Sequence, residues 1–192
     1  MAARVRCDWS ISDPLLQDYH DKEWGVPVHD DNQLFEFLTL EGAQAGLSWL
    51  TVLRKRENYR RAFDHFDIGK VSRYGDTKVK EMLEDPGIIR NKLKILSTTQ
   101  NAKCALNVIG EVGSLDKYFW GFVEGGKPKK NKWRGIVQIP ATSAESDLMS
   151  KDLAKRGFRF VGSTICYSFM QATGLVNDHK ATCFRYSEVC EY

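Results

Sequence analysis

Two cysteine–histidine pairs at opposite ends of the chain place the strongest constraint on its fold. Cys7 and His20 lie near the N-terminus, and His179 and Cys183 lie near the C-terminus. Two cysteines and two histidines fill the closed tetrahedral shell of a structural zinc ion. One ion bound by all four would join the first helix to the tail. The i, i+4 spacing of the second pair would let one helical turn direct both side chains at the ion, whereas the spacing of the first pair fits no short zinc finger.

The overall composition and net charge are compatible with nucleic-acid binding but do not indicate it. The 192 residues carry a net charge of +3. Basic residues are clustered, with aromatic residues interleaved, as on a surface that faces phosphates. For any one cluster, a solvated helix face is the simpler interpretation. The clusters lie within residues 54–61, 127–134 and 155–159.

The five cysteines form no short-range disulfide framework, and reduced thiols are typical of cytosolic or nuclear proteins. The first six residues are too short and too polar for a secretory signal. No apolar run approaches the length that spans a membrane. We therefore expect a cytoplasmic protein with no membrane association, with the nucleus or an organelle as alternatives, and nothing suggests more than a monomer.

Apolar residues recur mostly with helical periodicity, which predicts an all-α protein. We expect a single domain over residues 1–192, built as two helical lobes around a cleft. Residues 124–139 are rich in Gly and Lys and should form a loop, and no strand pair is recognisable. A capping box is expected at residues 142–145. The expected helices cover about residues 14–20, 31–45, 48–61, 77–83, 91–108, 115–123, 143–156 and 163–173.

Glu41 falls within the apolar stripe of the second expected helix, beside Leu34 and Leu38. A carboxylate on an apolar face is costly unless it is paired or meets a cationic or hydrogen-bonding ligand. In a generic helix, pairing with an Arg or Lys at the edge of the stripe is the simpler explanation. Trp49 and the flexible turn at residues 46–48 follow Glu41, and together they would suit a pocket for a flat ring with polar edges.

Two further features give weaker signals. Tyr19, beside His20, is either a second aromatic wall of such a pocket or a core residue. The turn from Gly157 to Gly162 has basic flanks and is a candidate phosphate cradle, although most such turns only connect helices. Phosphate-binding, dinucleotide-binding, zinc-deaminase and nucleophile-elbow motifs are all absent from the sequence.

Long segments of the chain strongly resemble the 3-methyladenine DNA glycosylase I (Tag) family of the helix–hairpin–helix glycosylase superfamily. The resemblance covers both ends and most of the first third, whereas residues 97–141 match only loosely. Ala43 departs from the polar residue expected in some relatives. The matching segments are RCDW at residues 6–9, DYHDKEWGVP at 18–27, LEGAQAGLSW at 40–49, TVLRKRENY at 51–59, and much of residues 155–179.

The resemblance implies an all-helical glycosylase fold with a structural zinc joining the two ends of the chain. It also implies an enzyme that flips 3-methyladenine out of alkylated double-stranded DNA and hydrolyses its bond to the sugar. The product would be an abasic site without strand cleavage. The implied residues are, for zinc, Cys7, His20, His179 and Cys183; for the base pocket, Tyr19, Glu41, Trp49 and Ser168; and for DNA, Gly46, Leu47, Gly157 and Gly162.

Glu41 is the residue expected to carry catalysis, because a buried carboxylate attracts a positively charged alkylated base. Asp178, next to a predicted zinc ligand, is assigned a structural role. Two other interpretations remain open. One is a zinc-stabilised module that recognises damaged duplex without catalysis, and the other is a metal-binding structural protein unrelated to DNA.

Overall fold

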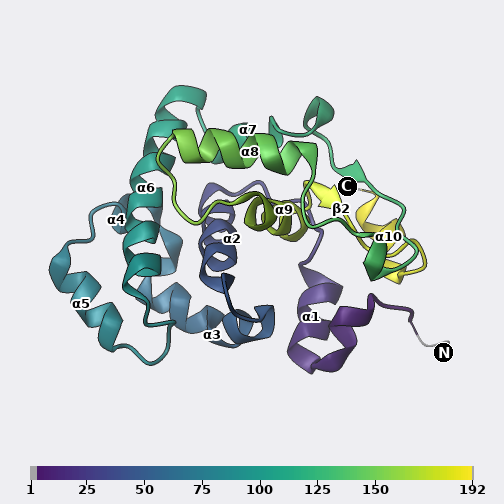
Figure 1. Ribbon diagram of the computed structural model, residues 1–192, viewed down its shortest axis with the longest axis horizontal. Coiled ribbons are helices and arrows are strands. Elements are labelled where there is room, and N and C mark those ends of the chain that lie inside the picture. The colour runs from purple at the N-terminus through teal and green to yellow at the C-terminus, as the bar shows by residue number, and fades with distance from the viewer. Residues whose placement is uncertain (1–3, 192) are drawn as a thin grey trace.

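The computed structural model describes residues 4–191 and is mostly helical, as predicted (Figure 1). The longer helices are α1 (Pro14–Lys22), α2 (Asp31–Gln44), α3 (Trp49–Ala62), α5 (Asp76–Glu84), α6 (Lys92–Val112), α8 (Ala144–Lys155) and α9 (Ser163–Ala172). The short elements are α4 (Ile68–Val71), α7 (Leu115–Trp120), α10 (Phe184–Val189) and four 3-10 turns at Asp8–Ser12, Asp64–Phe66, Glu124–Gly126 and Ile136–Gln138.

Side-chain caps explain why the first helices begin where the sequence predicted. At the start of α1, Asp13 Oδ1 accepts a hydrogen bond from the backbone N–H of Leu15 at 2.8 Å, and Pro14 occupies the first turn. At the start of α3, Ser48 Oγ accepts a hydrogen bond from Thr51 N at 3.2 Å. These bonds satisfy backbone donors that have no partner inside the helix.

Two helix ends differ from the prediction. α6 continues four residues beyond Val108, to Val112, and ends because Gly113 adopts the left-handed backbone conformation, with φ of +102°. α7 stops at Trp120 rather than Val123. The capping box of α8 is also displaced, because Ser143 and Ser146 exchange the two hydrogen bonds at 3.2 and 2.8 Å.

The expectation of no strand pair is wrong, since β1 (Lys129–Lys130) pairs in parallel with β2 (Val176–Asn177). Lys129 is paired with Val176 and Lys130 with Asn177. A ladder of two residues per strand leaves no alternating pattern in the sequence. The pair ties the predicted loop to the segment that carries the C-terminal metal-site residues.

Helix α2 lies at the centre of the fold and packs against α3, α6, α7 and α9 (Figure 1). Its residues from Leu34 to Ala43 are all buried. α8 packs against α9 across the turn that joins them. The two ends of the described chain also meet, because Phe184 N donates a hydrogen bond to Val5 O at 3.0 Å. None of the helices within residues 4–191 is long and apolar enough to cross a lipid bilayer.

Candidate active site and metal centre

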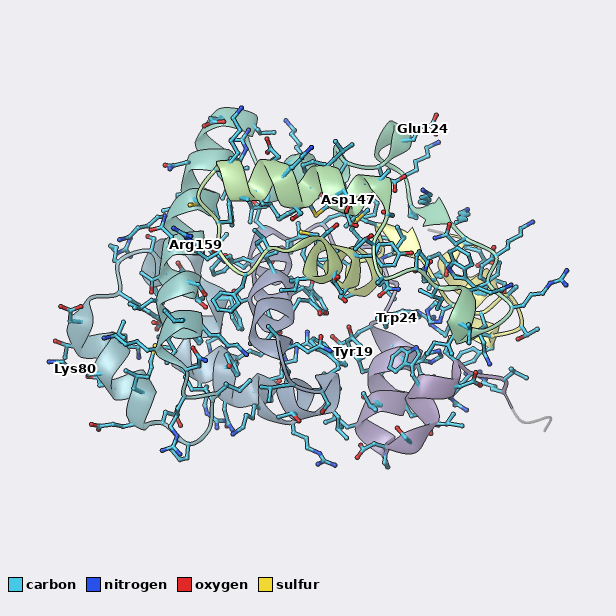
Figure 2. All side chains as sticks on the ribbon, viewed as in Figure 1. Tyr19, Trp24, Lys80, Glu124, Asp147 and Arg159 are labelled. Carbon is cyan, nitrogen blue, oxygen red and sulfur yellow. The ribbon has the colours of Figure 1, made fainter. Side chains whose placement is uncertain are left out.

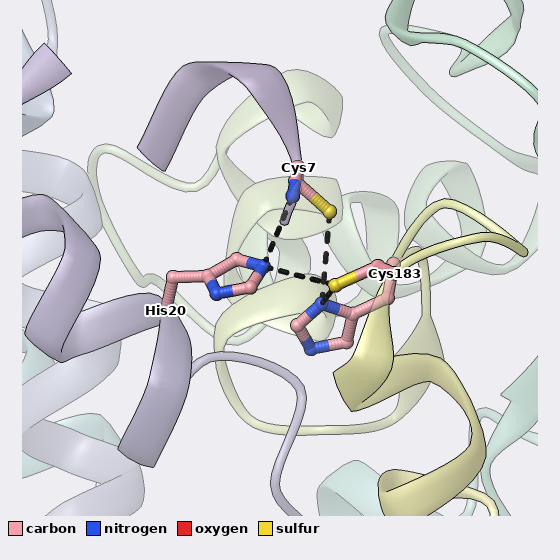
Figure 3. Close-up of side chains that lie close together, drawn as sticks. Cys7, His20 and Cys183 are labelled. Atoms are coloured by element: carbon pink, nitrogen blue, oxygen red, sulfur yellow. Dashed lines mark hydrogen bonds between the residues drawn. The ribbon is translucent and has the colours of Figure 1, made fainter. Parts of the chain in front are cut away.

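The four predicted metal ligands converge on one point (Figure 3). Cys7, His20, His179 and Cys183 are buried, and their ligand atoms all lie within 4.8 Å of one another. Cys183 Sγ lies 3.4 Å from His20 Nε2 and 3.7 Å from His179 Nδ1. Cys7 Sγ lies 3.7 Å from the same nitrogen of His179. This group has the side chains and the spacing to hold a metal ion.

Each histidine ring is oriented toward this point by a hydrogen bond from the ring nitrogen that faces away from the cysteines. His20 Nδ1 lies 2.8 Å from Asp21 Oδ1, and that carboxylate is held by Arg6 at 2.8 Å. His179 Nε2 lies 2.9 Å from the carbonyl oxygen of Trp24. A carbonyl or carboxylate oxygen only accepts, so each ring donates its outer N–H and presents a nitrogen lone pair to the cysteines.

The C-terminal ligands are not on one helical turn, contrary to the prediction. His179 follows β2, and Cys183 is the residue that precedes the first turn of α10. A turn rather than a helix therefore brings them together. Hydrogen bonding from Cys7 holds the pKa of the Cys183 thiol well below its ordinary value. The thiolate is the form of cysteine that binds metal.

A cleft of about 390 Å³ lies beside this centre and contains all four predicted base-pocket residues, Tyr19, Glu41, Trp49 and Ser168. Its walls come from α1, α2, α3, α9 and the loop before α8. Tyr19 points from α1 toward the interior of the molecule (Figure 2). Aromatic walls around a single carboxyl group suit a flat ring that carries positive charge.

The Glu41 carboxyl group lies inside this cleft, with 5% of the residue exposed. No hydrogen bond or ion pair to it occurs within residues 4–191. Burial raises its pKa to about 8. Glu36, on the same helix, has the kind of arginine partners that the simpler interpretation expected for Glu41. It pairs with Arg56 at 2.6 Å and with Arg60 at 2.9 Å. The carboxyl group of Glu41 is therefore free to pair with a ligand rather than committed to the fold.

The aromatic wall also retains unused polar groups. The centroids of the Tyr19 and Trp49 rings lie 5.4 Å apart. The indole N–H of Trp49 is buried and has no hydrogen-bond partner in the described chain. Burial, and then the nearby Glu41 charge, raise the pKa of the Tyr19 hydroxyl well above its ordinary value. Tyr19 thus remains a neutral donor that can bond to a ligand.

The turn after α2 borders a second, adjoining cavity of about 220 Å³. Gly46 and Leu47 line it together with Glu41 and Ser168. Gly46 has φ of +78°, in the left-handed region that glycine adopts without strain. Leu47 is 42% exposed. The structure thus places the predicted DNA-entering turn beside the predicted base pocket.

The turn between α8 and α9 lies outside both cavities. Gly157 follows α8 with φ of +90°, and a Cβ there would lie 3.5 Å from Cys104 Sγ. Gly162 precedes α9 with ordinary backbone angles and open space around it. Between them, Phe160 adopts a positive φ of +55°. The turn leads directly into α9, which carries Ser168 into the cleft.

A comparison with known proteins decides the family. The family model described as methyladenine glycosylase matches residues 9–186. The chain belongs to the methyladenine glycosylase family. The resemblance inferred from the sequence is therefore confirmed.

Two named relatives align with nearly the whole of this chain. It is 48% identical over 181 residues to DNA-3-methyladenine glycosylase 1 of Escherichia coli (strain K12), covering 94% of this chain and 96% of that protein. It is 43% identical to DNA-3-methyladenine glycosylase of Haemophilus influenzae, covering 93% and 96%. The family model spans residues 9–186, so three of the four candidate metal ligands, His20, His179 and Cys183, lie within the matched range.

Solved structures of the same family have the same fold. A crystal structure of 3-methyladenine DNA glycosylase I matches with a TM-score of 0.91 at 48% identity, covering 94% of this chain and 98% of that one. A structure of the Staphylococcus aureus enzyme, described as the basis of 3-methyladenine recognition, matches with a TM-score of 0.90 at 34% identity, covering 93% and 95%.

Two residues on α6 that the sequence did not single out shape this methyladenine glycosylase family member. Lys94 Nζ donates to the carbonyl oxygens of Ala43 and Ala45 at 2.8 and 2.7 Å and so holds the end of α2. Asn101 Nδ2 donates to Arg159 O at 3.0 Å, and Asn101 Oδ1 accepts from Arg159 N at 2.8 Å. Partners about 50 residues away along the chain leave no local signal.

Asp178 is buried and accepts four hydrogen bonds, which agrees with the structural role assigned to it. Asn131 Nδ2 and Trp133 Nε1 donate to Oδ1 at 2.7 Å each. The Tyr167 hydroxyl and Gln171 Nε2 donate to Oδ2 at 2.7 and 2.8 Å. These donors come from the loop before α8 and from α9, so Asp178 fixes two walls of the cleft.

Proposed function

We propose that this chain extrudes 3-methyladenine from alkylated double-stranded DNA and hydrolyses the bond between the base and its sugar, leaving an abasic site. The observation that carries the proposal is the unpaired, buried carboxyl group of Glu41 in a cleft walled by aromatic rings. The reaction is the one named for relatives at 48% and 43% identity.

Extrusion is required because the bond to be broken is unreachable inside a stacked duplex. A methyl group on N3 gives the base in DNA a positive charge. An opposite charge within a few ångströms favours the ionised carboxyl group, so the bound base should convert Glu41 to the carboxylate. That carboxylate then holds the charged ring and accepts a hydrogen bond from its exocyclic amine. Trp49 adds an aromatic and cation–π contact of about 0.5–2 kcal/mol, and Tyr19 closes the aromatic wall beside it.

The alkylated base is a good leaving group, so water can attack the sugar without a strong general base. Asp178 is the nearest acidic candidate for that role, but its four hydrogen bonds commit its oxygens to the fold. Within the described residues, lysine is absent from the walls of the cleft and of the adjoining cavity. That absence supports a monofunctional enzyme, since a Schiff base would need an amine there.

We propose Zn²⁺ as the ion held by Cys7, His20, His179 and Cys183. A tetrahedral zinc shell with bonds of about 2.0–2.3 Å has ligand atoms about 3.5 Å apart. Three of the sulfur–nitrogen separations, at 3.4, 3.7 and 3.7 Å, lie close to that value. Four protein ligands leave no open position, so the ion would stabilise the fold and join its two ends rather than take part in the reaction.

The DNA contacts are part of the same proposal. Leu47 would enter the duplex as the base leaves, because it lies beside the cleft and is partly exposed. The turn from Gly157 to Gly162 would grip phosphates as the hairpin of a helix–hairpin–helix motif, with the N-terminus of α9 behind it. We further propose one glycosylase domain over residues 1–192, acting as a cytoplasmic monomer, and the five unbridged cysteines suit a reducing compartment.

One incubation separates this function from its rivals. Duplex DNA treated with a methylating agent is incubated with the protein, and the released bases are separated by chromatography. The proposed enzyme releases 3-methyladenine and leaves abasic sites in unbroken strands. A non-catalytic module that recognises damage would bind the DNA and release nothing, and a structural metal protein would do neither.

A further inference from the structure

Two separate segments place exposed apolar residues near the cleft that contains Glu41. Leu47, on the turn after α2, lines the adjoining cavity. In the loop between β1 and α8, Ile136 lines the cleft itself but is 52% exposed. Val137 follows it and is 97% exposed. Two adjacent branched side chains left in water at the mouth of a binding cleft indicate a surface that a partner covers.

Hydrogen bonds hold the base of this loop in place, so the exposed tip at residues 136–137 has a defined position. Asp178 binds Asn131 and Trp133 at the start of the loop, and Ala181 N donates to Trp133 O at 2.8 Å. Closer to the tip, Gln138 Oε1 accepts a hydrogen bond from the backbone N–H of Arg134 at 2.7 Å. The chain around the tip is thereby closed into a tight turn that holds Val137 outward.

The charged residues within residues 131–141 are all basic. Lys132 and Arg134 are exposed, and neither forms an ion pair within residues 4–191. Lys129, in the same basic run, is instead paired with Glu145 at 2.5 Å. Residues 131–141 contain no acidic side chain. Apolar side chains flanked by unpaired cations match the sugar and base edges of a nucleic-acid strand together with its phosphates.

We propose that the tip at Ile136 and Val137 is a second contact with the damaged duplex. It rests on the sugar and base edges of the damaged strand beside the extruded nucleotide, and Lys132 and Arg134 bind the neighbouring phosphates. Together with Leu47, which lines the adjoining cavity, the tip gives the strand two apolar contacts near the base that leaves. The inference rests on the proposed function, because it requires the cleft to receive a nucleotide from DNA.

The test uses the full-length protein and a duplex oligonucleotide that contains one stable tetrahydrofuran analogue of an abasic site. Val137→Ser should weaken binding to this duplex about five-fold or more, and Val137→Leu should retain it, because the contact is apolar. Val137 does not line the cleft, so the affinity of Val137→Ser for free 3-methyladenine should equal that of the wild type. Leu106→Ser, on α6 and 41% exposed, is the matched control and should bind both ligands normally.

A second measurement addresses the phosphate contacts. The double variant Lys132→Gln/Arg134→Gln should reduce the slope of log affinity against log salt by about two, because each cation lost releases one fewer counterion. Val137→Ser should leave that slope unchanged.

The inference is overturned if Val137→Ser binds the duplex as tightly as the wild type, or loses no more affinity than Leu106→Ser. If the wild type still releases 3-methyladenine, that result removes only the tip contact and leaves the proposed function standing. A wild-type protein that releases no methylated base would remove the proposed function and this inference together.

Discussion

The rings of Tyr19 and Trp49 lie 5.4 Å apart between centroids, with their planes inclined by 49°. A purine sandwiched between two rings needs about 7 Å, which is two van der Waals contacts of about 3.5 Å. In this geometry the extruded base therefore stacks on one ring only. Trp49 presents the larger face and an unpartnered N–H, so we expect it to be the stacking ring, with Tyr19 closing the wall beside it.

This arrangement predicts unequal effects of changing the two rings. Trp49→Ala should weaken binding of free 3-methyladenine by about ten-fold or more, since stacking on an aromatic ring contributes roughly 1–3 kcal/mol per base. Tyr19→Phe keeps the ring and loses only a hydroxyl, so its effect should be smaller. Titration calorimetry on both variants measures the difference. Equal losses in the two variants would show that Tyr19 contributes as much as the indole.

The buried Glu41 carboxyl group predicts the pH dependence of the reaction. Its pKa in the free protein is about 8, so it is protonated at lower pH and must ionise to hold a cationic base. Because kcat/KM reports the free enzyme, it should rise with pH by about ten-fold per unit below that pKa and level off above it. A kcat/KM that stays flat between pH 6 and 9 would contradict this assignment, and Glu41→Gln should abolish the rise.

The same group predicts how stability changes with pH. Its pKa is about 8 in the folded protein against an ordinary value of 4.5, so the folded state binds more protons between these two values. The free energy of unfolding must then fall as the pH rises through this window. Glu41→Gln has no carboxyl group to ionise, so its free energy of unfolding does not fall for this reason. The Tm of the wild type should therefore decline relative to that of the variant between pH 5 and 8. Parallel Tm curves for the two proteins would show that the carboxyl group is not buried as described.

The metal centre predicts linked losses of zinc and of stability. Cys183→Ala should lower the bound zinc measured by elemental analysis and lower the Tm by on the order of 10 °C, because the proposed ion would join the two ends of the chain. Cys104→Ala, also a buried cysteine but outside the centre, is the control and should retain the metal. An unchanged zinc content in Cys183→Ala would remove Cys183 from the site.

The two hydrogen bonds between Asn101 and Arg159 hold the turn between α8 and α9 in place, and we expect their loss to affect DNA binding. Asn101→Ala would leave the backbone N–H and carbonyl of Arg159 without partners and cost about 1–3 kcal/mol for each group left unpaired. Affinity for duplex DNA should fall, while binding of free 3-methyladenine in the cleft stays unchanged. Asn101→Asp keeps the acceptor and loses the donor, so its affinity for duplex DNA should lie between those of the wild type and Asn101→Ala. A weaker affinity for the free base would indicate a wider disruption of the fold.

Local chemistry explains what the sequence predicted well. Caps such as Asp13 and Ser48 act within three residues of themselves, so their helices began where expected. Glu41 was recognisable because a carboxylate on a buried helix face breaks the apolar pattern, although the sequence could not tell that Glu36 would be paired and Glu41 would not. The position of Glu41 in the ring-lined cleft agrees with the interpretation, while the role of each site residue remains a prediction.

Contacts between distant segments explain what the sequence did not predict. The hydrogen bonds of Lys94 and Asn101 join segments about 50 residues apart, and the two-residue strand pair has no periodicity to detect. The i, i+4 spacing of His179 and Cys183 was compatible with a helical turn, but the two residues lie on a turn between β2 and α10. In each case tertiary packing, rather than the local sequence, determines the geometry.

Release of 3-methyladenine from methylated duplex DNA by Glu41→Gln tests the central claim most directly. Glutamine preserves the size of the side chain and removes its charge, so the fold and the zinc content should be unchanged. We predict that the rate of release falls on the order of 100-fold, as when a buried electrostatic contact to a reacting group is removed, and that Glu41→Ala falls at least as far. Release at the wild-type rate by either folded variant would contradict the account.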